Sequence, residues 1–211
     1  MSENVLINCR YINYIILGYL LGSIMFGYII VKLFKKIDII KESKDNNPGT
    51  ANAFVHGGIL CGSFTLLLDL LKGFIPVFLA KTFLGLDNYL FVFVMIAPVV
   101  GHAFPLFNKF KKGGKCIAVS FGTLLGLFPN FRIALLLAFW YLFFSLILII
   151  KPHSLRTVWT YLCFFISVIF FTKILVVIFG CLFTSLIVII RHIGSLKKIE
   201  NKEVHLLFRR R

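Results

Sequence analysis

Residues 11–34 read YINYIILGYLLGSIMFGYIIVKLF, an apolar run that carries a single charge, Lys32. A run of about twenty apolar residues is long enough to cross the hydrocarbon core of a bilayer as a helix. It is longer than the apolar part of a secretory signal, and no small-x-small cleavage site follows it. We therefore interpret it as a retained transmembrane span, which places the chain among integral membrane proteins.

The composition of the whole chain agrees with this class. Of its 211 residues 59% are hydrophobic and 15% are charged, whereas globular domains lie near half apolar and a quarter charged. The net charge of +15 would suit nucleic acid only as a basic face on a soluble fold. Here the cations lie in short gaps between apolar runs, so we expect no nucleic-acid partner. The five cysteines are scattered without any CxxC spacing, which predicts neither a metal site nor a disulfide framework.

Seven apolar runs predict seven transmembrane helices in one all-α domain that covers residues 1–211. The sequence shows no internal repeat and no low-complexity linker that would divide it. Charge or turn residues bound each run. The predicted helices are 11–34, 57–80, 88–103, 116–129, 132–150, 157–172 and 174–192.

The distribution of cations predicts the topology. With seven spans, one side of the membrane receives loops 35–56 and 104–115, the short loop 151–156 and the tail 191–211. Together with Lys32 at the boundary of the first helix, that side carries 18 Lys and Arg residues and the other carries 4. By the positive-inside rule the N-terminus is outside and the C-terminus is cytoplasmic. The polar loops then share the cytoplasmic face.

The most polar stretch within the apolar sequence is 101–115, which holds four lysines. Gly113, Gly114 and Lys115 lead directly into a predicted helix, so backbone N–H groups, the positive end of a helix dipole and a cation come together. Such a set favours a small phosphate, although the spacing is not that of a Walker motif. His102 ends the preceding helix; a lone histidine there is more often a hydrogen-bonded interface residue than a catalyst.

Two other stretches on the same side offer hydrogen-bond donors to an anion. Loop 38–52 contains the turn signal Asn-Asn-Pro-Gly followed by Thr50 and Asn52. Arg191 and His192 leave the last helix, with the hydroxyl of Ser195 close behind. For the basic tail the alternative is attraction to anionic lipid headgroups. For the loop lysines it is cytoplasmic charge alone.

The second predicted helix carries two charges, Asp69 and Lys72. A spacing of three places both side chains on one helical face, where they can pair. Ionisable residues within a span are costly and usually face the bundle interior. We favour a structural ion pair over direct catalysis. Gly22 and Gly27 in the first helix are typical of close helix packing.

Taken together, these motifs resemble one family, the bacterial acyl-phosphate:glycerol-3-phosphate acyltransferases of the PlsY type. The resemblance covers nearly the whole chain and is carried by several motifs in the family's order. They are Gly22-Ser23-Ile24 with Phe26-Gly27, Asn47-Pro48-Gly49-Thr50-Ala51-Asn52, Asp69 to Gly73 (D-x-x-K-G), Gly101-His102-Ala103-Phe104-Pro105-Leu106-Phe107 with Gly113-Gly114-Lys115, and Arg191-His192.

The resemblance implies a seven-helix enzyme of the bacterial plasma membrane that transfers a fatty acyl group from acyl phosphate to the 1-hydroxyl of glycerol 3-phosphate. It implies no cofactor, and the soluble enzyme that makes acyl phosphate becomes a candidate partner beside the membrane lipids. Acyl phosphate is already activated, so no Ser or Cys nucleophile is required. The expected catalytic or orienting residues are Ser23, His102 and His192, and the expected substrate-binding residues are Asn47, Gly49, Thr50, Asn52, Lys109, Gly113, Gly114, Lys115, Arg191 and Ser195.

The chain departs from the family pattern at three polar positions, Ile40, Val55 and Ser195. Ile40 stands where the family usually has Arg, and the Lys41 that follows cannot reproduce Arg's bidentate grip on phosphate. An altered acceptor therefore stays open as an alternative. A non-catalytic transporter or lipid-binding protein is a further one, although the chain shows no inverted repeat.

Overall fold

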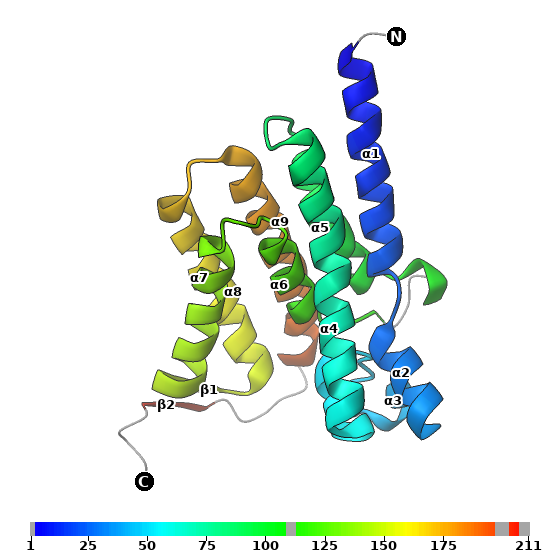
Figure 1. Ribbon diagram of the computed structural model, residues 1–211. Coiled ribbons are helices and arrows are strands. Elements are labelled where there is room, and N and C mark those ends of the chain that lie inside the picture. The colour runs from blue at the N-terminus through cyan, green and yellow to red at the C-terminus, as the bar shows by residue number, and fades with distance from the viewer. Residues whose placement is uncertain (1–2, 109–112, 197–202, 207–211) are drawn as a thin grey trace.

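The structure is a computed structural model that describes residues 3–108, 113–196 and 203–206. It is a helical bundle with one small sheet (Figure 1). The helices are α1 (Glu3–Gly22), α2 (Phe26–Lys35), α3 (Ile39–Glu42), α4 (Thr50–Leu84), α5 (Phe91–Ala103), α6 (Ile117–Leu125), α7 (Arg132–Leu142), α8 (His153–Phe171) and α9 (Leu175–Leu196), with a 3-10 turn η1 (Leu106–Asn108) and a π-helical turn η2 (Phe143–Ile147). The strands are β1 (Leu148–Lys151) and β2 (Glu203–Leu206).

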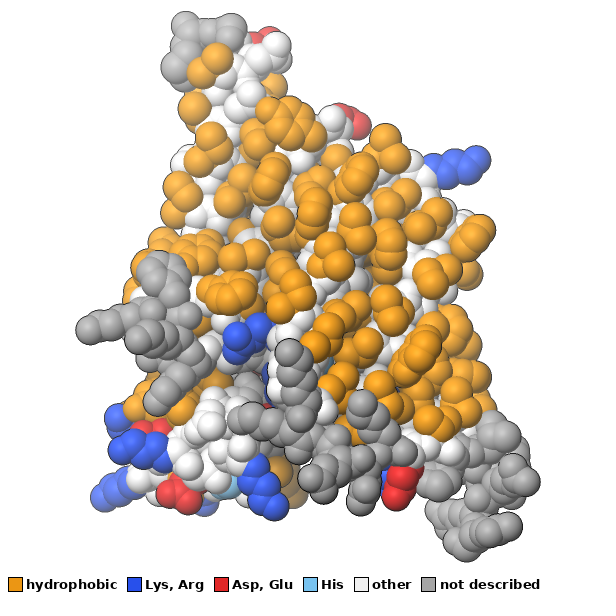
Figure 2. Space-filling view, turned by 180° about the vertical axis from the view of Figure 1, so that it is seen from behind, with side chains coloured by type: hydrophobic (Ala, Val, Ile, Leu, Met, Phe, Trp, Pro, Cys, Tyr) orange, Lys and Arg blue, Asp and Glu red, His pale blue; other side chains and the backbone are white. Residues whose placement is uncertain are grey.

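Four segments of the described chain are long and apolar enough to cross a membrane: Glu3–Lys35, Thr50–Leu84, His153–Phe171 and Leu175–Gly194. Phe91–Ala103 and Arg132–Ile147 are apolar but shorter, and α6 has only nine residues. The all-helical membrane class is therefore confirmed, whereas the lengths do not by themselves give seven spans. Figure 2 shows hydrophobic side chains over the middle of the molecule, with most charged side chains at its lower end.

Close helix contacts depend on small residues. A Cβ at Gly22 would collide with the carbonyl oxygen of Pro98, and one at Gly101 would collide with that of Tyr19. Glycine at these positions lets the backbones of α1 and α5 touch, as small residues do in membrane bundles. The packing role predicted for Gly22 is confirmed.

The prediction of one helix over 11–34 is wrong. The helix breaks at Ser23–Met25, and α2 begins at Phe26 after Met25, whose backbone is not helical (φ −89°, ψ 78°). The break leaves the carbonyl of Ile24 without a helical partner, and the Lys72 ammonium donates to it at 2.7 Å. A cation on another helix thus satisfies the interrupted backbone, which hydropathy alone does not reveal.

The second helix begins seven residues earlier than the predicted 57, at Thr50. It contains a non-helical residue, Gly58, at φ 79°. Only glycine adopts this conformation without steric cost, so the helix continues across a kink at that point. The extension brings the Asn-Pro-Gly turn directly onto the start of α4.

The predicted helix 132–150 is wrong at its end. After η2 the chain becomes strand β1, which pairs antiparallel with β2 in the register Leu148 with Leu206 and Lys151 with Glu203. A short apolar run is ambiguous between helix and strand, and here a segment more than fifty residues later supplies the hydrogen bonds. α5, α6, α8 and α9 correspond to the predicted 88–103, 116–129, 157–172 and 174–192 with shifted ends.

Segments distant in sequence gather at one end of the bundle. α2, α3, the start of α4 and the β1–β2 ribbon lie at the lower end in Figure 1, opposite the N-terminal end of α1. Segment 113–116 reaches the same end, because Lys115 pairs with Asp45 in the loop before α4. This end contains the polar motifs.

Candidate active site

A cavity of about 620 Å³ lies at this end of the bundle. Its lining has a polar part, which includes Asp45 and Lys115, and an apolar part with side chains such as Leu66, Phe121 and Leu125. Six of the residues expected at the site line it: Asn47, Gly49, Thr50, Asn52, His102 and Lys115. The structure therefore brings the loop before α4, the end of α5 and the start of α6 around one space.

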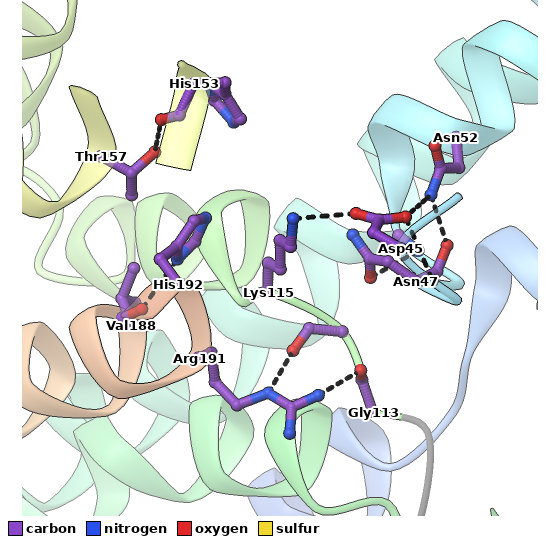
Figure 3. A network of polar contacts seen from close by, with 12 residues as sticks. Asp45, Asn47, Asn52, Gly113, Lys115, His153, Thr157, Val188, Arg191 and His192 are labelled. Carbon is purple, nitrogen blue, oxygen red and sulfur yellow. Dashed lines mark hydrogen bonds and ion pairs between the residues drawn. The ribbon is translucent and has the colours of Figure 1, made fainter. Parts of the chain in front are cut away.

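The polar wall is organised by Asp45. Its carboxylate pairs with Lys115 (Oδ2 to Nζ, 2.8 Å) and accepts a hydrogen bond from the amide of Asn52 (Oδ1 to Nδ2, 2.8 Å) (Figure 3). Asn52 also donates to the carbonyl of Asn47, and the Asn47 side chain accepts from the N–H of Gly49. The Asn-Asn-Pro-Gly turn is thus held by its own side chains and presents Lys115 with a counter-charge.

Two opposing effects act on the pKa of Asp45. Partial burial raises it, because desolvation disfavours the charged carboxylate. Hydrogen bonds from Lys115 and Asn52 and the positive charge of Lys115 outweigh burial, so the pKa lies below its ordinary value. Asp45 is a carboxylate at neutral pH, and it forms an ion pair with the ammonium of Lys115.

Arg191 fixes the two glycines. From α9 it donates through Nε to the carbonyl of Gly114 (3.1 Å) and through Nη2 to that of Gly113 (2.5 Å). The guanidinium also stacks over the ring of Phe104. The N–H of Gly114 donates to the carbonyl of His102. That amide is therefore already hydrogen-bonded, contrary to the expectation that it is available to phosphate, and the role visible for Arg191 is to hold this segment in place.

The Asp69–Lys72 ion pair is confirmed at 2.8 Å, and both side chains are fully buried. Thr50 donates to the second carboxylate oxygen of Asp69 (3.0 Å). The Lys72 ammonium contacts Asp69, the carbonyl of Ile24 and Nδ1 of His102 (2.8 Å). The pair therefore links the break after α1, the start of α4 and the end of α5.

The contact with Lys72 indicates the tautomer of the His102 ring. An ammonium only donates hydrogen bonds, so Nδ1 of His102 accepts and the neutral ring carries its hydrogen on Nε2. A Cβ at Gly114 would collide with this Nε2, which shows how closely the segment passes over the ring. In this state the ring is a hydrogen-bond donor at Nε2 and not a proton acceptor.

His192 has the opposite arrangement. Its Nδ1 lies 2.7 Å from the carbonyl of Val188 and donates to it, so the neutral ring keeps an unprotonated Nε2. The residue is completely buried, and Nε2 has no hydrogen-bond partner among the described residues. His153, the first residue of α8, lines the cavity and lies edge-to-face with His192, with ring centroids 6.1 Å apart.

Ser23 lies apart from the other expected residues. It is buried at the break after α1, and its hydroxyl donates to the carbonyl of Tyr19 (2.8 Å). It lines a second cavity of about 590 Å³, with Tyr28, Asp38 and Ile40 among its walls. The structure therefore does not bring Ser23 into the space around Lys115.

The side chains of two expected residues are not among those that the structure describes. Lys109 lies outside the described residues, and for Ser195 only the helical backbone is described. The sequence reasoning missed Asp45 and His153. Asp45 precedes the Asn-Asn-Pro-Gly turn and was detectable as a local acceptor, whereas nothing in the sequence around His153 indicates a site. In the described part of the chain, no cluster of three His, Cys, Asp or Glu side chains could hold a metal ion.

Fold and site together define a class of protein: an all-helical integral membrane protein with a cavity at one end of its bundle that both polar and apolar side chains line. The sequence model of one family, described as Glycerol-3-phosphate acyltransferase, matches residues 12–202. The chain belongs to this family. A curated glycerol-3-phosphate acyltransferase of Staphylococcus haemolyticus is 35% identical over 193 residues, which are 88% of this chain and 92% of that one.

Another relative of the same name, from Thermotoga petrophila, is 50% identical over 109 residues. The match covers 52% of this chain, which spans about half the length of that relative (54%). Among solved structures, the crystal structure of PlsY (YgiH), an integral membrane glycerol 3-phosphate acyltransferase, is similar in its glycerol 3-phosphate form. The TM-score is 0.78 at 30% identity, with 90% of this chain and 91% of that chain covered. The lysophosphatidic acid form of the same protein gives 0.76.

Proposed function

We propose that this chain transfers a fatty acyl group from acyl phosphate to the 1-hydroxyl of glycerol 3-phosphate, forming lysophosphatidate and inorganic phosphate. The observation that carries the proposal is a cavity lined by both polar and apolar side chains. Lys115, Asn52 and His102 form a wall suited to phosphate and hydroxyl groups, and the apolar wall suits an acyl chain that enters from the bilayer. Family membership and the similarity to a protein solved with glycerol 3-phosphate and with lysophosphatidic acid support it.

In the proposed reaction Lys115 exchanges its partner. A substrate phosphate competes with the carboxylate of Asp45 for the ammonium, since both are oxygen anions. Arg191 keeps segment 113–114 against the His102 ring. The cation of Lys115 and the donor of His102 therefore keep fixed positions relative to each other. We keep Lys109, Ser195 and the amide of Gly113 as further phosphate contacts of this proposal.

His102 acts in the proposal as a hydrogen-bond donor. Its Nε2–H can stabilise the negative charge that develops on an acyl or phosphoryl oxygen, the kind of preorganised contact that lowers barriers. Thr50, Asn47, Gly49 and Asn52 shape the wall on which glycerol 3-phosphate is oriented. Ser23 acts from the second cavity, beside the Ile24 carbonyl that Lys72 holds.

The proposal includes the topology. We propose seven spans in a single domain over residues 1–211, with the N-terminus outside, the C-terminus cytoplasmic and the site on the cytoplasmic face of the bacterial plasma membrane. The cation asymmetry supports this orientation. A cytoplasmic site can receive acyl phosphate directly from the soluble enzyme that makes it, which is the proposed partner.

The decisive experiment gives purified full-length protein acyl phosphate and labelled glycerol 3-phosphate, with acyl-coenzyme A as a control donor. We expect lysophosphatidate from acyl phosphate. Loss of a charged hydrogen bond worth about 1.5–3 kcal/mol predicts that Lys115→Ala lowers kcat/KM roughly ten- to a hundredfold. Lys35→Ala removes an exposed cation at the same end without touching the cavity, so it should keep full activity.

Lack of product from the intact protein, under conditions where a related enzyme works, would overturn the proposal. If Lys115→Ala is as active as the parent, the proposed reaction stands, but Lys115 does not bind the substrate phosphate. The same assay with other small phosphorylated or hydroxylated acceptors tests the alternative raised by Ile40. That residue is buried and lines the second cavity, so it offers no cation to an acceptor phosphate.

A further inference from the structure

A cavity of about 570 Å³ lies between α1 and the end of α4, and it has no part in the proposed reaction. α1 reaches it near its N-terminal end, which Figure 1 shows opposite the β1–β2 ribbon and therefore opposite the candidate active site. We call this cavity the α1–α4 groove. Its lining residues are Arg10, Asn13, Tyr14 and Leu17 from α1, with Phe83 and Leu84 from α4.

The polar side chains of the groove are unsatisfied. The guanidinium of Arg10 and the amide of Asn13 are exposed, and neither forms a hydrogen bond or ion pair with another described residue. The hydroxyl of Tyr14, which is half-buried, also has no partner in the described part of the chain. Tyr11, by contrast, donates to the carbonyl of Leu84 at 2.9 Å and joins the two helices. The groove thus offers a cation and several donors that the fold itself does not use.

These groups are ordered along the helix. The four lining residues of α1 recur at spacings of three and four, so they share one helical face. Arg10 lies nearest the N-terminal end, and Leu17 lies about 10 Å further along, at about 1.5 Å per residue. Asn13 and Tyr14 lie between them, and the two residues of α4 supply an apolar wall opposite. From the end of the bundle inward, the groove therefore presents a cation, then two hydrogen-bond donors, then apolar surface.

A phospholipid carries matching groups in the same order. Its phosphate lies at the membrane surface, its ester carbonyls follow, and its acyl chains extend inward. A guanidinium binds phosphate oxygens through two parallel N–H bonds. Ester carbonyls only accept hydrogen bonds, which Asn13 and Tyr14 can donate, and tyrosine is typical of this depth in a membrane. A soluble phosphate would use the first of these groups and leave the others unpaired.

The charge of the groove favours a lipid with net negative charge. Arg10 is the one charged side chain among the described residues that line it, and no carboxylate there offsets the cation. A zwitterionic headgroup brings a cation of its own, for which the lining holds no counter-charge. In the proposed topology this end is the outer one, where the chain has only four cations. An arginine at a groove on that side goes against the general bias of charge, and an anionic partner accounts for it.

We propose that the α1–α4 groove binds one anionic phospholipid of the leaflet opposite the candidate active site, with its phosphate on Arg10 and an acyl chain between Leu17 and Phe83. At this level α1 is joined to its neighbours by hydrogen bonds such as that of Asn8 with Asn88. A lipid in the groove adds apolar contacts with both helices and ties α1 to α4. The inference does not depend on acyl transfer.

The test is native mass spectrometry of the purified full chain, released from neutral detergent that contains either phosphatidylglycerol or phosphatidylcholine with the same acyl chains. We expect the parent to bind phosphatidylglycerol about fivefold more tightly, which is the effect of one cation at a membrane surface. Arg10→Gln should lose this preference, and Arg10→Lys should lose less of it, because it keeps the charge without the bidentate geometry. The matched control is Arg132→Gln, at an exposed arginine outside the groove, which should bind as the parent does.

A second variant tests the apolar wall. Phe83→Ala removes exposed apolar surface from the groove but no charge, so it should weaken both lipids alike, by roughly threefold. Equal thermal midpoints without lipid show that the variants fold. Unchanged phosphatidylglycerol binding in Arg10→Gln would overturn the inference. So would displacement of the lipid by an equal concentration of glycerophosphoglycerol, which lacks acyl chains, or a lipid-free dimer of the parent that Arg10→Gln dissociates.

Discussion

Two ion pairs of equal length lie in opposite environments. Asp69–Lys72 and Asp45–Lys115 both measure 2.8 Å, but the side chains of the first pair are at most 2% exposed, while those of the second are 33% and 18% exposed. The first joins neighbours on one helix. The second joins segments seventy residues apart, across the cavity wall.

The difference indicates different roles. Lys72 has three partners and Asp69 two, so the buried pair is fully occupied and removal of either charge leaves the other uncompensated in a dry interior. The pair at the cavity is solvated, and such pairs contribute only about 0–1 kcal/mol to stability. The first pair holds helices together, and in our proposal the second pair exchanges Asp45 for a ligand.

The largest effect should follow from Asp69→Ala, which strands the buried ammonium of Lys72. By analogy with other buried pairs we expect a loss of about 3–5 kcal/mol in the free energy of unfolding. Denaturant unfolding in detergent micelles measures it. The double variant Asp69→Ala with Lys72→Met is the control and should recover much of the loss, because no charge is stranded. A single variant as stable as the parent would contradict a structural role.

A smaller effect should follow from Asp45→Asn. The amide keeps an oxygen that can accept from Asn52 but removes the charge that Lys115 pairs with. Since an exposed pair of this kind contributes at most about 1 kcal/mol, we expect phosphate binding to tighten roughly two- to fivefold, with stability changed by less than that amount. Titration with inorganic phosphate measures it.

The matched control is Glu42→Gln, which removes an exposed carboxylate at the same end, outside the cavity. It should leave binding unchanged. Weaker binding in Asp45→Asn would show that Asp45 positions Lys115 for the ligand and does not compete with it.

The smallest effect should be one of pH on the cavity pair. The pKa of Asp45 is lowered in the folded state, so its contribution to stability is complete above the ordinary carboxyl pKa and is lost as the pH falls through the folded value. The difference in thermal midpoint between the parent and Asp45→Asn should be constant above about pH 5 and shrink as the pH falls below about 4. Thermal unfolding as a function of pH measures it, and a difference that grows on acidification would reverse the sign assigned to the pair.

The two pairs also show what could be predicted from the sequence. Spacing along one helix predicted Asp69–Lys72, because a helix fixes which residues share a face. Asp45–Lys115 depends on how α4 and α5 return the chain to the same end, and no local pattern encodes that return. The same applies to the Lys72 contact with His102, which determines the hydrogen position on the ring.

The secondary-structure predictions show the same contrast between local patterns and tertiary contacts. The apolar runs predicted where helices lie, while their ends were wrong where tertiary contacts decide: at Ser23–Met25, where Lys72 satisfies a broken backbone, and at Leu148–Lys151, where β2 pairs with the chain. Six of the expected site residues, which all belong to motifs, line one cavity, whereas Ser23 lines another. His153 carries no motif, and only the fold places it beside His192.

The contacts at the cavity end also impose a rule of parity on the membrane crossings. Groups that touch at the cavity end share one face of the membrane, so an even number of crossings separates Asp45 from Lys115, and likewise Gly113 from Arg191 and β1 from β2. The short helices α6 and α7 therefore either both cross the membrane or both do not. With Glu3–Lys35 as one crossing, the total is odd for any such choice, and this supports the proposed topology with the two ends of the chain on opposite faces.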